Sequence, residues 1–140
     1  DVQDPGNVGT MIRTADAAGF DGVMLSKASA DLYSLKTLRS MQGSHFHLPI
    51  WKMDREELFE RASQSNLAVL ATTLSEASID YRQLPQIDQM ILVMGNEGKG
   101  ISPEMATRAD QLVHITMPGR AESLNVAVAA GILMFHLRNF

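Results

Sequence analysis

The chain has 140 residues, 45 % of them hydrophobic, which suits one domain with a substantial core. It has no cysteine, which excludes a disulfide scaffold and any thiolate metal site and agrees with a reducing compartment such as the cytoplasm. The formal charge of −4 argues against tight nucleic-acid binding by this chain alone, and no membrane-spanning segment is visible.

The first predicted helix follows a turn-rich loop, Asp1–Asn7. We expect Asn7 to cap this helix, apolar residues to recur at helical spacing after it, and Gly19 to end it. Arg13 lies off the apolar stripe, about two turns from the loop. Its local context alone is typical of a solvated surface arginine.

A short strand and a second helix are expected next. The strand is Val23–Leu25, and the helix is expected to begin at Asp31 with Leu32, Leu35 and Leu38 turned inward. Two histidines follow, His45 and His47.

Those histidines lie two apart in a strand-like run that ends at Ile50, so they share one face. A metal could use both, but no third ligand of matching spacing is apparent, and we expect no metal there.

The middle of the chain contains a helix and a buried strand. Asp54 and Glu57 form a capping-box pattern at the start of the helix. Leu67–Ala71 is an almost continuous apolar run, which is typical of a strand covered on both faces. Thr72, at its carboxyl end, opens a polar loop where open parallel sheets bind ligands.

A glycine-rich loop, Gly95–Ser102, follows the strand Met90–Met94. The Walker A spacing fails because Lys99 is followed by glycine, and the dinucleotide spacing fails too. Glu97 stands at the centre of the loop, so a ligand with hydroxyls or positive charge suits it better than a triphosphate.

The last predicted strand ends at Ile115, and a polar loop leads to a final helix that is apolar on nearly every side. A helix of this kind is buried by its own domain or by a partner subunit. Ser123 and Asn125 precede it and are N-cap residue types. They either only cap the helix or also help to hold a polar ligand.

Strands and helices therefore alternate along the whole chain. This order predicts an α/β fold with a mostly parallel sheet flanked by helices, and it places the polar loops near one edge of the sheet.

Three stretches together resemble the SpoU (TrmH-like) branch of the SPOUT RNA methyltransferases. They are DPGNVGTMIRTADAAGF (residues 4–20), ILVMGNEGKGIS (91–102) and ITMPGRAESLNVAVAAGILMF (115–135). The resemblance covers essentially the whole chain.

The resemblance implies a SPOUT fold with a C-terminal trefoil knot whose loops hold S-adenosylmethionine. It implies a homodimer with active sites near the interface, acting without a metal, a membrane or DNA. The implied reaction is methyl transfer to a ribose 2′-hydroxyl of ribosomal or transfer RNA.

Family roles map onto matching positions of this sequence. The resemblance implies these catalytic residues: Arg13, Asn7, Glu97, Ser123 and Asn125. It implies these cofactor-binding residues: Thr72, Gly95, Ile115, Leu124 and Asn125.

The chain departs from the family pattern at its start, because Asp1 lies within the first motif. The family has a strand just before this motif, central to the sheet, and often a separate N-terminal RNA-binding domain. We expect residues 1–140 to be the catalytic domain without these two parts. The main alternative is a non-catalytic dimeric RNA-binding or assembly factor on the same fold, and a nucleotide hydrolase is disfavoured because both phosphate motifs fail.

Overall fold

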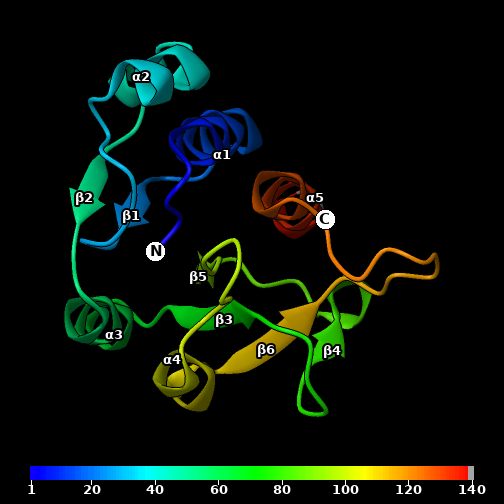
Figure 1. Cartoon of the computed structure of the whole chain (residues 1–140). Coiled ribbons are helices and arrows are strands. Elements are labelled where there is room, and N and C mark those ends of the chain that lie inside the picture. Colours follow the sequence, from blue (N-terminus) through cyan, green and yellow to red (C-terminus); the bar gives the residue numbers. More distant parts are fainter. Residues whose placement is uncertain (139–140) are drawn as a thin grey trace.

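The computed structural model describes residues 1–138, in which helices and strands alternate (Figure 1). The helices are α1 (Pro5–Ala18), α2 (Leu35–Met41), α3 (Arg55–Gln64), α4 (Pro103–Arg108) and α5 (Val126–Arg138). The strands are β1 (Val23–Leu25), β2 (Ile50–Lys52), β3 (Ala68–Thr72), β4 (Ile79–Asp80), β5 (Met90–Val93) and β6 (Gln111–His114). Short 3-10 turns lie at Ser44–Phe46 and Tyr81–Gln83. None of the helices within this range is long and apolar enough to cross a bilayer.

The strands form two parallel sheets. One contains β1 and β2, and the other has the order β4-β6-β3-β5. Every ladder is parallel, for example Val69 opposite Ile91 in the β3–β5 pair. The predicted α/β class with a parallel sheet is therefore confirmed.

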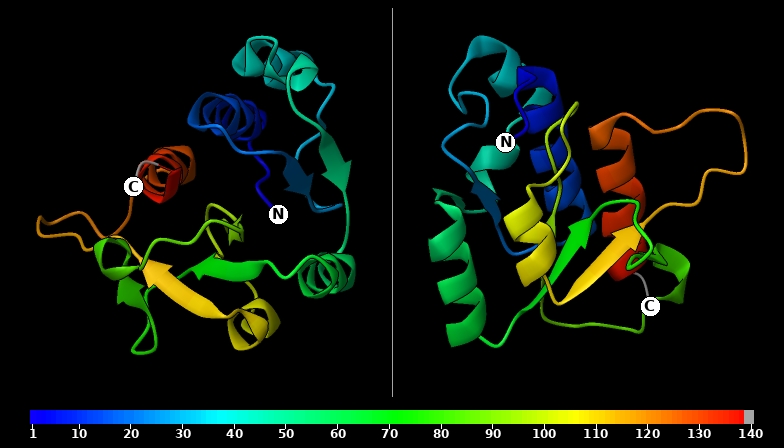
Figure 2. Two further views of the ribbon diagram at one scale, coloured as in Figure 1. Left: turned by 180° about the vertical axis from the view of Figure 1, so that it is seen from behind. Right: turned by 60° about the horizontal axis from the view of Figure 1, so that its bottom comes forward.

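Helices cover both faces of the larger sheet (Figures 1 and 2). Leu70 of β3 packs in one cluster with Leu133 and Leu137 of α5. Its neighbours Val69 and Ala71 pack in another cluster on the other face, with residues of α3 and α4. The alternation follows from the two-residue period of a strand, and it explains why this run is apolar throughout.

The first helix, α1, packs against both α2 and α5. Its close approach to α2 requires glycine at position 9. A Cβ on Gly9 would lie 2.5 Å from both the Ser40 Cβ and the Thr37 carbonyl oxygen of α2. Any side chain at this position would therefore push α1 and α2 apart. Gly19, with φ of 82°, ends α1 in the left-handed conformation, as predicted.

Two predicted helix starts are wrong. Asp4, not Asn7, caps α1: its side chain accepts a hydrogen bond from the Asn7 backbone N–H, and Pro5 takes the first helical position. The second helix begins at Leu35 after the cap Ser34, because Asp31 forms a local turn by accepting from the Tyr33 N–H. Leu35 is consequently 64 % exposed rather than turned inward.

The two histidines do not share a strand. His45 lies in the 3-10 turn, where its ring packs on Phe46, and His47 Nδ1 lies 2.8 Å from Asp16 Oδ2. Within residues 1–138, no three His, Cys, Asp or Glu side chains are grouped to hold a metal ion.

Candidate active site

Glu97 receives three hydrogen bonds from the start of the chain. Its carboxylate accepts from the backbone N–H of Gln3 at 3.0 Å, from that of Asp4 at 2.8 Å and from Asn7 Nδ2 at 3.2 Å. The glycine-rich loop is thereby tied to the first turn of α1, although about 90 residues separate the two in sequence.

These bonds lower the pKa of Glu97. Partial burial of the carboxylate raises the pKa, but the hydrogen bonds from Gln3, Asp4 and Asn7 outweigh it and bring the pKa to about 2. Glu97 is therefore an ionised hydrogen-bond acceptor at neutral pH, which is unsuited to the role of general base.

A relay of side-chain hydrogen bonds continues from Asn7 to α5. Asn7 gives its Nδ2 to Glu97, and its Oδ1 accepts from Asn125 Nδ2 at 3.2 Å. Asn125 Oδ1 in turn accepts from the backbone N–H groups of Ala127 and Val128, so Asn125 caps α5. Each amide can satisfy these partners in one orientation only, and the relay Glu97–Asn7–Asn125 joins all three motifs.

Asn96 stabilises the glycine-rich loop and was missed by the sequence reasoning. Its Oδ1 accepts from the N–H groups of Gly98 and Lys99, and its Nδ2 donates to the Asp1 carbonyl. An asparagine beside a glycine-rich turn is the signal that could have identified it.

The glycine at the start of this loop has a structural reason of its own. A Cβ on Gly95 would lie 2.3 Å from the Gly100 carbonyl carbon and 2.5 Å from the Ile101 nitrogen. The loop could not close on itself with a larger residue there.

Three of the residues implied to bind the cofactor follow the carboxyl ends of neighbouring strands. Thr72, Gly95 and Ile115 end or follow β3, β5 and β6, which are adjacent in the order β6-β3-β5. Thr72 Oγ1 donates to the Val93 carbonyl at 3.1 Å and so links β3 to β5. The hydroxyl of Thr72 is thus engaged within the sheet.

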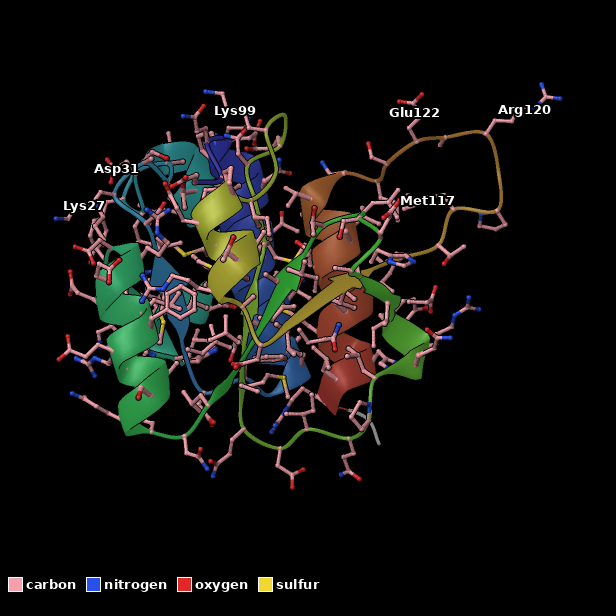
Figure 3. All side chains as sticks on the ribbon, turned by 90° about the horizontal axis from the view of Figure 1, so that it is seen from below. Lys27, Asp31, Lys99, Met117, Arg120 and Glu122 are labelled. Atoms are coloured by element: carbon pink, nitrogen blue, oxygen red, sulfur yellow. The ribbon has the colours of Figure 1, made fainter. Side chains whose placement is uncertain are left out.

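The loop over residues 116–125 stands away from the rest of the domain. Figure 3 shows Arg120 and Glu122 pointing outward from it. Its start is held by Asp80, whose Oδ2 accepts from the Thr116 N–H at 3.2 Å, and its end by Asn125. Ser123 is exposed, and Leu124 is 37 % exposed. The structure therefore does not bring these two residues onto the relay.

Arg13 is exposed on α1 and lies about 9 Å along the helix from Asn7. The ion pairs found among residues 1–138 do not include it. Its guanidinium is therefore available to an anion from outside the chain, such as a phosphate group.

A shallow hollow of about 620 Å³ adjoins the relay and reaches the outer side of α5. Asn7 and Asn125 line it together with Lys36, Val128 and Ile132. The hollow combines the ion pair of Lys36 and Asp4 with amide side chains and an apolar rim.

A stability measurement tests the state of Glu97. Its folded pKa of about 2 is below its usual 4.5, so its ionised form stabilises the fold above pH 4.5, and this contribution is lost as the pH falls towards 2. We expect the wild-type chain to lose stability relative to Glu97→Gln across this window, measured as urea midpoints at each pH. A difference that stays constant with pH would show that the carboxylate is not held as described.

Groups at the strand ends and in the loop before α5 suit an adenosine moiety. Partly exposed apolar side chains, Ile115 and Leu124, can contact a flat ring, while loop backbone groups and the alcohol of Ser123 can bond hydroxyls. The donor set thus fits S-adenosylmethionine and offers no cluster for a metal.

Comparison with known proteins agrees with this geometry. Residues 1–135 match the sequence model of a family described as the SpoU rRNA Methylase family. The 23S rRNA (guanosine(2553)-2′-O)-methyltransferase RlmP of Bacillus subtilis is 46 % identical over 137 residues, which are 98 % of this chain and 55 % of RlmP.

Two solved structures match in both fold and sequence. An AdoMet-bound rRNA methyltransferase from Sinorhizobium meliloti superposes with a TM-score of 0.90 at 44 % identity, over 98 % of this chain and 52 % of that one. The SpoU methyltransferase AviRb from Streptomyces viridochromogenes, in complex with AdoMet, gives 0.88 at 30 % identity, over 96 % of this chain and 55 % of that one. The chain thus spans about half the length of these relatives.

Proposed function

The chain belongs to the SpoU rRNA methylase family, and from this premise we propose that it is the catalytic domain of an RNA 2′-O-methyltransferase. It moves a methyl group from S-adenosylmethionine to a ribose 2′-hydroxyl. The observation that carries the proposal is the hydrogen-bonded relay Glu97–Asn7–Asn125, which joins the three family motifs at one place.

Ribosomal RNA is the favoured substrate class over transfer RNA. The relative at 46 % identity is named for position 2553 of 23S rRNA, and the solved structure at 44 % is named an rRNA methyltransferase. Both identities extend over 98 % of this chain.

S-adenosylmethionine would be held by Thr72, Gly95, Ile115, Leu124 and Asn125, with the loops in the knotted arrangement implied by the family. When bound, it supplies a methyl group on a positively charged sulfur, which is already reactive. The chain's own task is to exclude water and to orient the ribose hydroxyl.

Arg13 activates the nucleophile by charge rather than by taking its proton. A guanidinium is always protonated in proteins, so it cannot act as the base. Arg13 instead binds the phosphate next to the ribose and stabilises the negative charge that develops on the 2′-oxygen. The 2′-oxygen would take up the methyl group that bound S-adenosylmethionine supplies, and the hydroxyl proton would pass to phosphate or water.

Ser123 and the relay residues hold the loops around this reaction. The relay joins the start of α1 to the start of α5. Ser123, which is exposed in the loop before α5, would contact the substrate. Glu97 is a residue that positions the loops, because its carboxylate already accepts three hydrogen bonds from the chain itself.

A homodimer is part of the proposal, and α5 provides its surface. Val128, Ile132 and Phe135 follow at spacings of four and three on one side of α5 and are 52 %, 36 % and 44 % exposed. An apolar stripe of this kind on an otherwise buried helix marks a contact with another protein surface. The hollow beside the relay is continuous with it, so a second copy would border the active site.

Ile132→Glu should separate such a dimer. A carboxylate at the centre of the stripe would be buried without a partner, and we expect dimer affinity to fall by about a hundredfold. Sedimentation equilibrium measures the change, and Leu74→Glu, at a position 78 % exposed in a distant loop, is the matched control. If the two substitutions lowered dimer affinity equally, α5 would not form the interface.

Two measurements test the activity. Calorimetric titration with S-adenosylmethionine should show saturable binding, with ATP as the negative control. Transfer of a labelled methyl group should then reach 23S rRNA in preference to transfer RNA, with the label on a ribose oxygen. Binding without transfer to any RNA would favour the non-catalytic assembly factor, and no binding by the folded chain or by a longer form of it would contradict the proposal.

A further inference from the structure

Phe46 is the most exposed large apolar side chain in the part of the chain that the structure describes, at 81 %. The backbone around it is nevertheless fixed, because Ser44 and Leu48 on either side are buried. Its ring packs on that of His45, with the ring centroids 4.0 Å apart, and most of it stays open to solvent. A single exposed apolar residue needs no explanation, but an aromatic ring held outward on a fixed turn presents a flat face to a ligand.

The next residue, His47, is fastened to the first helix. The turn packs against α1, and His47 Nδ1 lies 2.8 Å from Asp16 Oδ2. The His47 side chain is 64 % exposed, and its Nε2 has no hydrogen-bond partner among residues 1–138. Because Asp16 engages Nδ1, Nε2 is the atom that can bond a ligand. It accepts from a hydroxyl when the ring is neutral and donates to a phosphate when the ring is protonated.

Arg13 lies on the side of α1 that faces this turn. Asp16 follows it by three positions, and Gly9, four positions before it, packs against Ser40 of α2. Residues three or four apart are neighbours on a helix surface, so Arg13 lies between these two contacts. Its guanidinium, which the proposed function assigns to the phosphate beside the methylated ribose, therefore lies about one turn, or ~5 Å along the helix, from the pair of Asp16 and His47.

The charges around the turn favour a nucleotide as the ligand. Residues 32–53 contain no Asp or Glu, in a chain that has 16 of them. Asp16, which adjoins the turn, is already bound by His47. An open aromatic ring beside a guanidinium suits an unpaired nucleotide better than an apolar protein surface, because bases stack on aromatic rings and arginine binds phosphate.

We propose that residues 44–47 form a platform for the unpaired RNA nucleotide that adjoins the methylated one, an inference that rests on the proposed function. The base of this nucleotide stacks on Phe46, and its sugar–phosphate backbone contacts Nε2 of His47. Arg13 holds the phosphate that joins the two nucleotides, so α1 sets the path of the RNA strand. A base reaches Phe46 only when it is splayed out, so the substrate is a single-stranded loop or bulge rather than a duplex.

The test compares Phe46→Ala with Phe46→Tyr, which keeps an aromatic ring, and with Leu74→Ala, which removes an apolar side chain of similar exposure, 78 %, from a distant loop. The binding probes are single-stranded hexaadenylate and hexauridylate, and 23S rRNA is the substrate for methyl transfer. Calorimetric titration with S-adenosylmethionine and thermal unfolding check that each variant is intact, and neither should change, because the altered side chains are exposed.

We expect Phe46→Ala to weaken the binding of hexaadenylate by about tenfold and that of hexauridylate by less, because a larger base stacks more strongly on an aromatic ring. The KM for 23S rRNA should rise by about as much at unchanged kcat, as for lost binding that is uniform along the reaction. Phe46→Tyr and Leu74→Ala should resemble the wild type. His47→Ala should weaken both oligonucleotides alike, because a backbone contact does not distinguish bases.

Unchanged oligonucleotide affinities and KM in Phe46→Ala would overturn the platform. So would an equal loss for the two oligonucleotides, because the base would then not be stacked. Weaker self-association of Phe46→Ala in sedimentation, with RNA binding intact, would assign Phe46 to a contact between copies of the chain instead. The proposed function fails separately: a wild-type chain that binds hexaadenylate through Phe46 but methylates no RNA would contradict that function and leave the platform standing.

Discussion

Arg13→Ala should abolish methyl transfer while leaving the binding of S-adenosylmethionine unchanged. Arg13 is exposed and outside the relay, so its removal disturbs neither the loops nor the core. What is lost is the positive charge beside the developing alkoxide, and removal of one such group costs about 100- to 1,000-fold in rate. Single-turnover transfer to RNA and calorimetric titration of the methyl donor measure the two effects separately.

Arg39→Ala is the matched control for Arg13, since Arg39 is an exposed arginine on the neighbouring helix α2. Its loss should leave the rate near that of the wild type. Arg13→Lys should recover only part of the rate, because an ammonium group keeps the charge but not the paired geometry with phosphate. Equal loss of binding and transfer in Arg13→Ala would show instead that Arg13 supports the fold of the donor site.

Local signals in the sequence predicted most of the fold. The capping box of Asp54 and Glu57 is present at α3 as expected. The apolar runs became β3 and β5 within one residue at each end. These elements were predictable because their signals lie within a few residues of each other and are not opposed by tertiary contacts.

The two errors in helix starts occurred where two neighbouring residues offered the same signal. Asp4 and Asn7 are both cap residue types, and the choice depends on Pro5, which fits the first helical position after Asp4. Asp31 and Ser34 compete in the same way at α2. The two-residue strand β4 was not predicted, because a segment this short has no periodicity to detect.

The sequence did not predict how the candidate site residues are connected. The resemblance named Asn7, Glu97 and Asn125, yet nothing in the local sequence shows that Asn7 bonds to the other two. Glu97 lies 90 positions after Asn7, and Asn125 lies 118 positions after it. The trefoil knot, which the family resemblance implies, stays a prediction. The passage of one chain segment through a loop leaves no local pattern in the sequence.

The relay also separates two roles of Asn125 that the sequence alone left open. Its Oδ1 caps α5 through Ala127 and Val128, and its Nδ2 holds Asn7. Asn125→Ala removes both, so we expect a loss of stability of about 1 kcal/mol, typical of a lost cap, and a loss of methyl transfer. Thermal unfolding and single-turnover transfer measure the two consequences.

Asn125→Asp distinguishes the cap from the relay. Aspartate is as good a cap as asparagine and is favoured at the positive end of a helix, so stability should return to the wild-type level. It has no N–H to give Asn7, and Asn7 cannot turn to donate to it without releasing Glu97. We therefore expect Asn125→Asp to fold like the wild type but to remain deficient in transfer. If Asn125→Asp recovered both stability and methyl transfer, Asn125 would act only as a helix cap, and the relay would have no part in the mechanism.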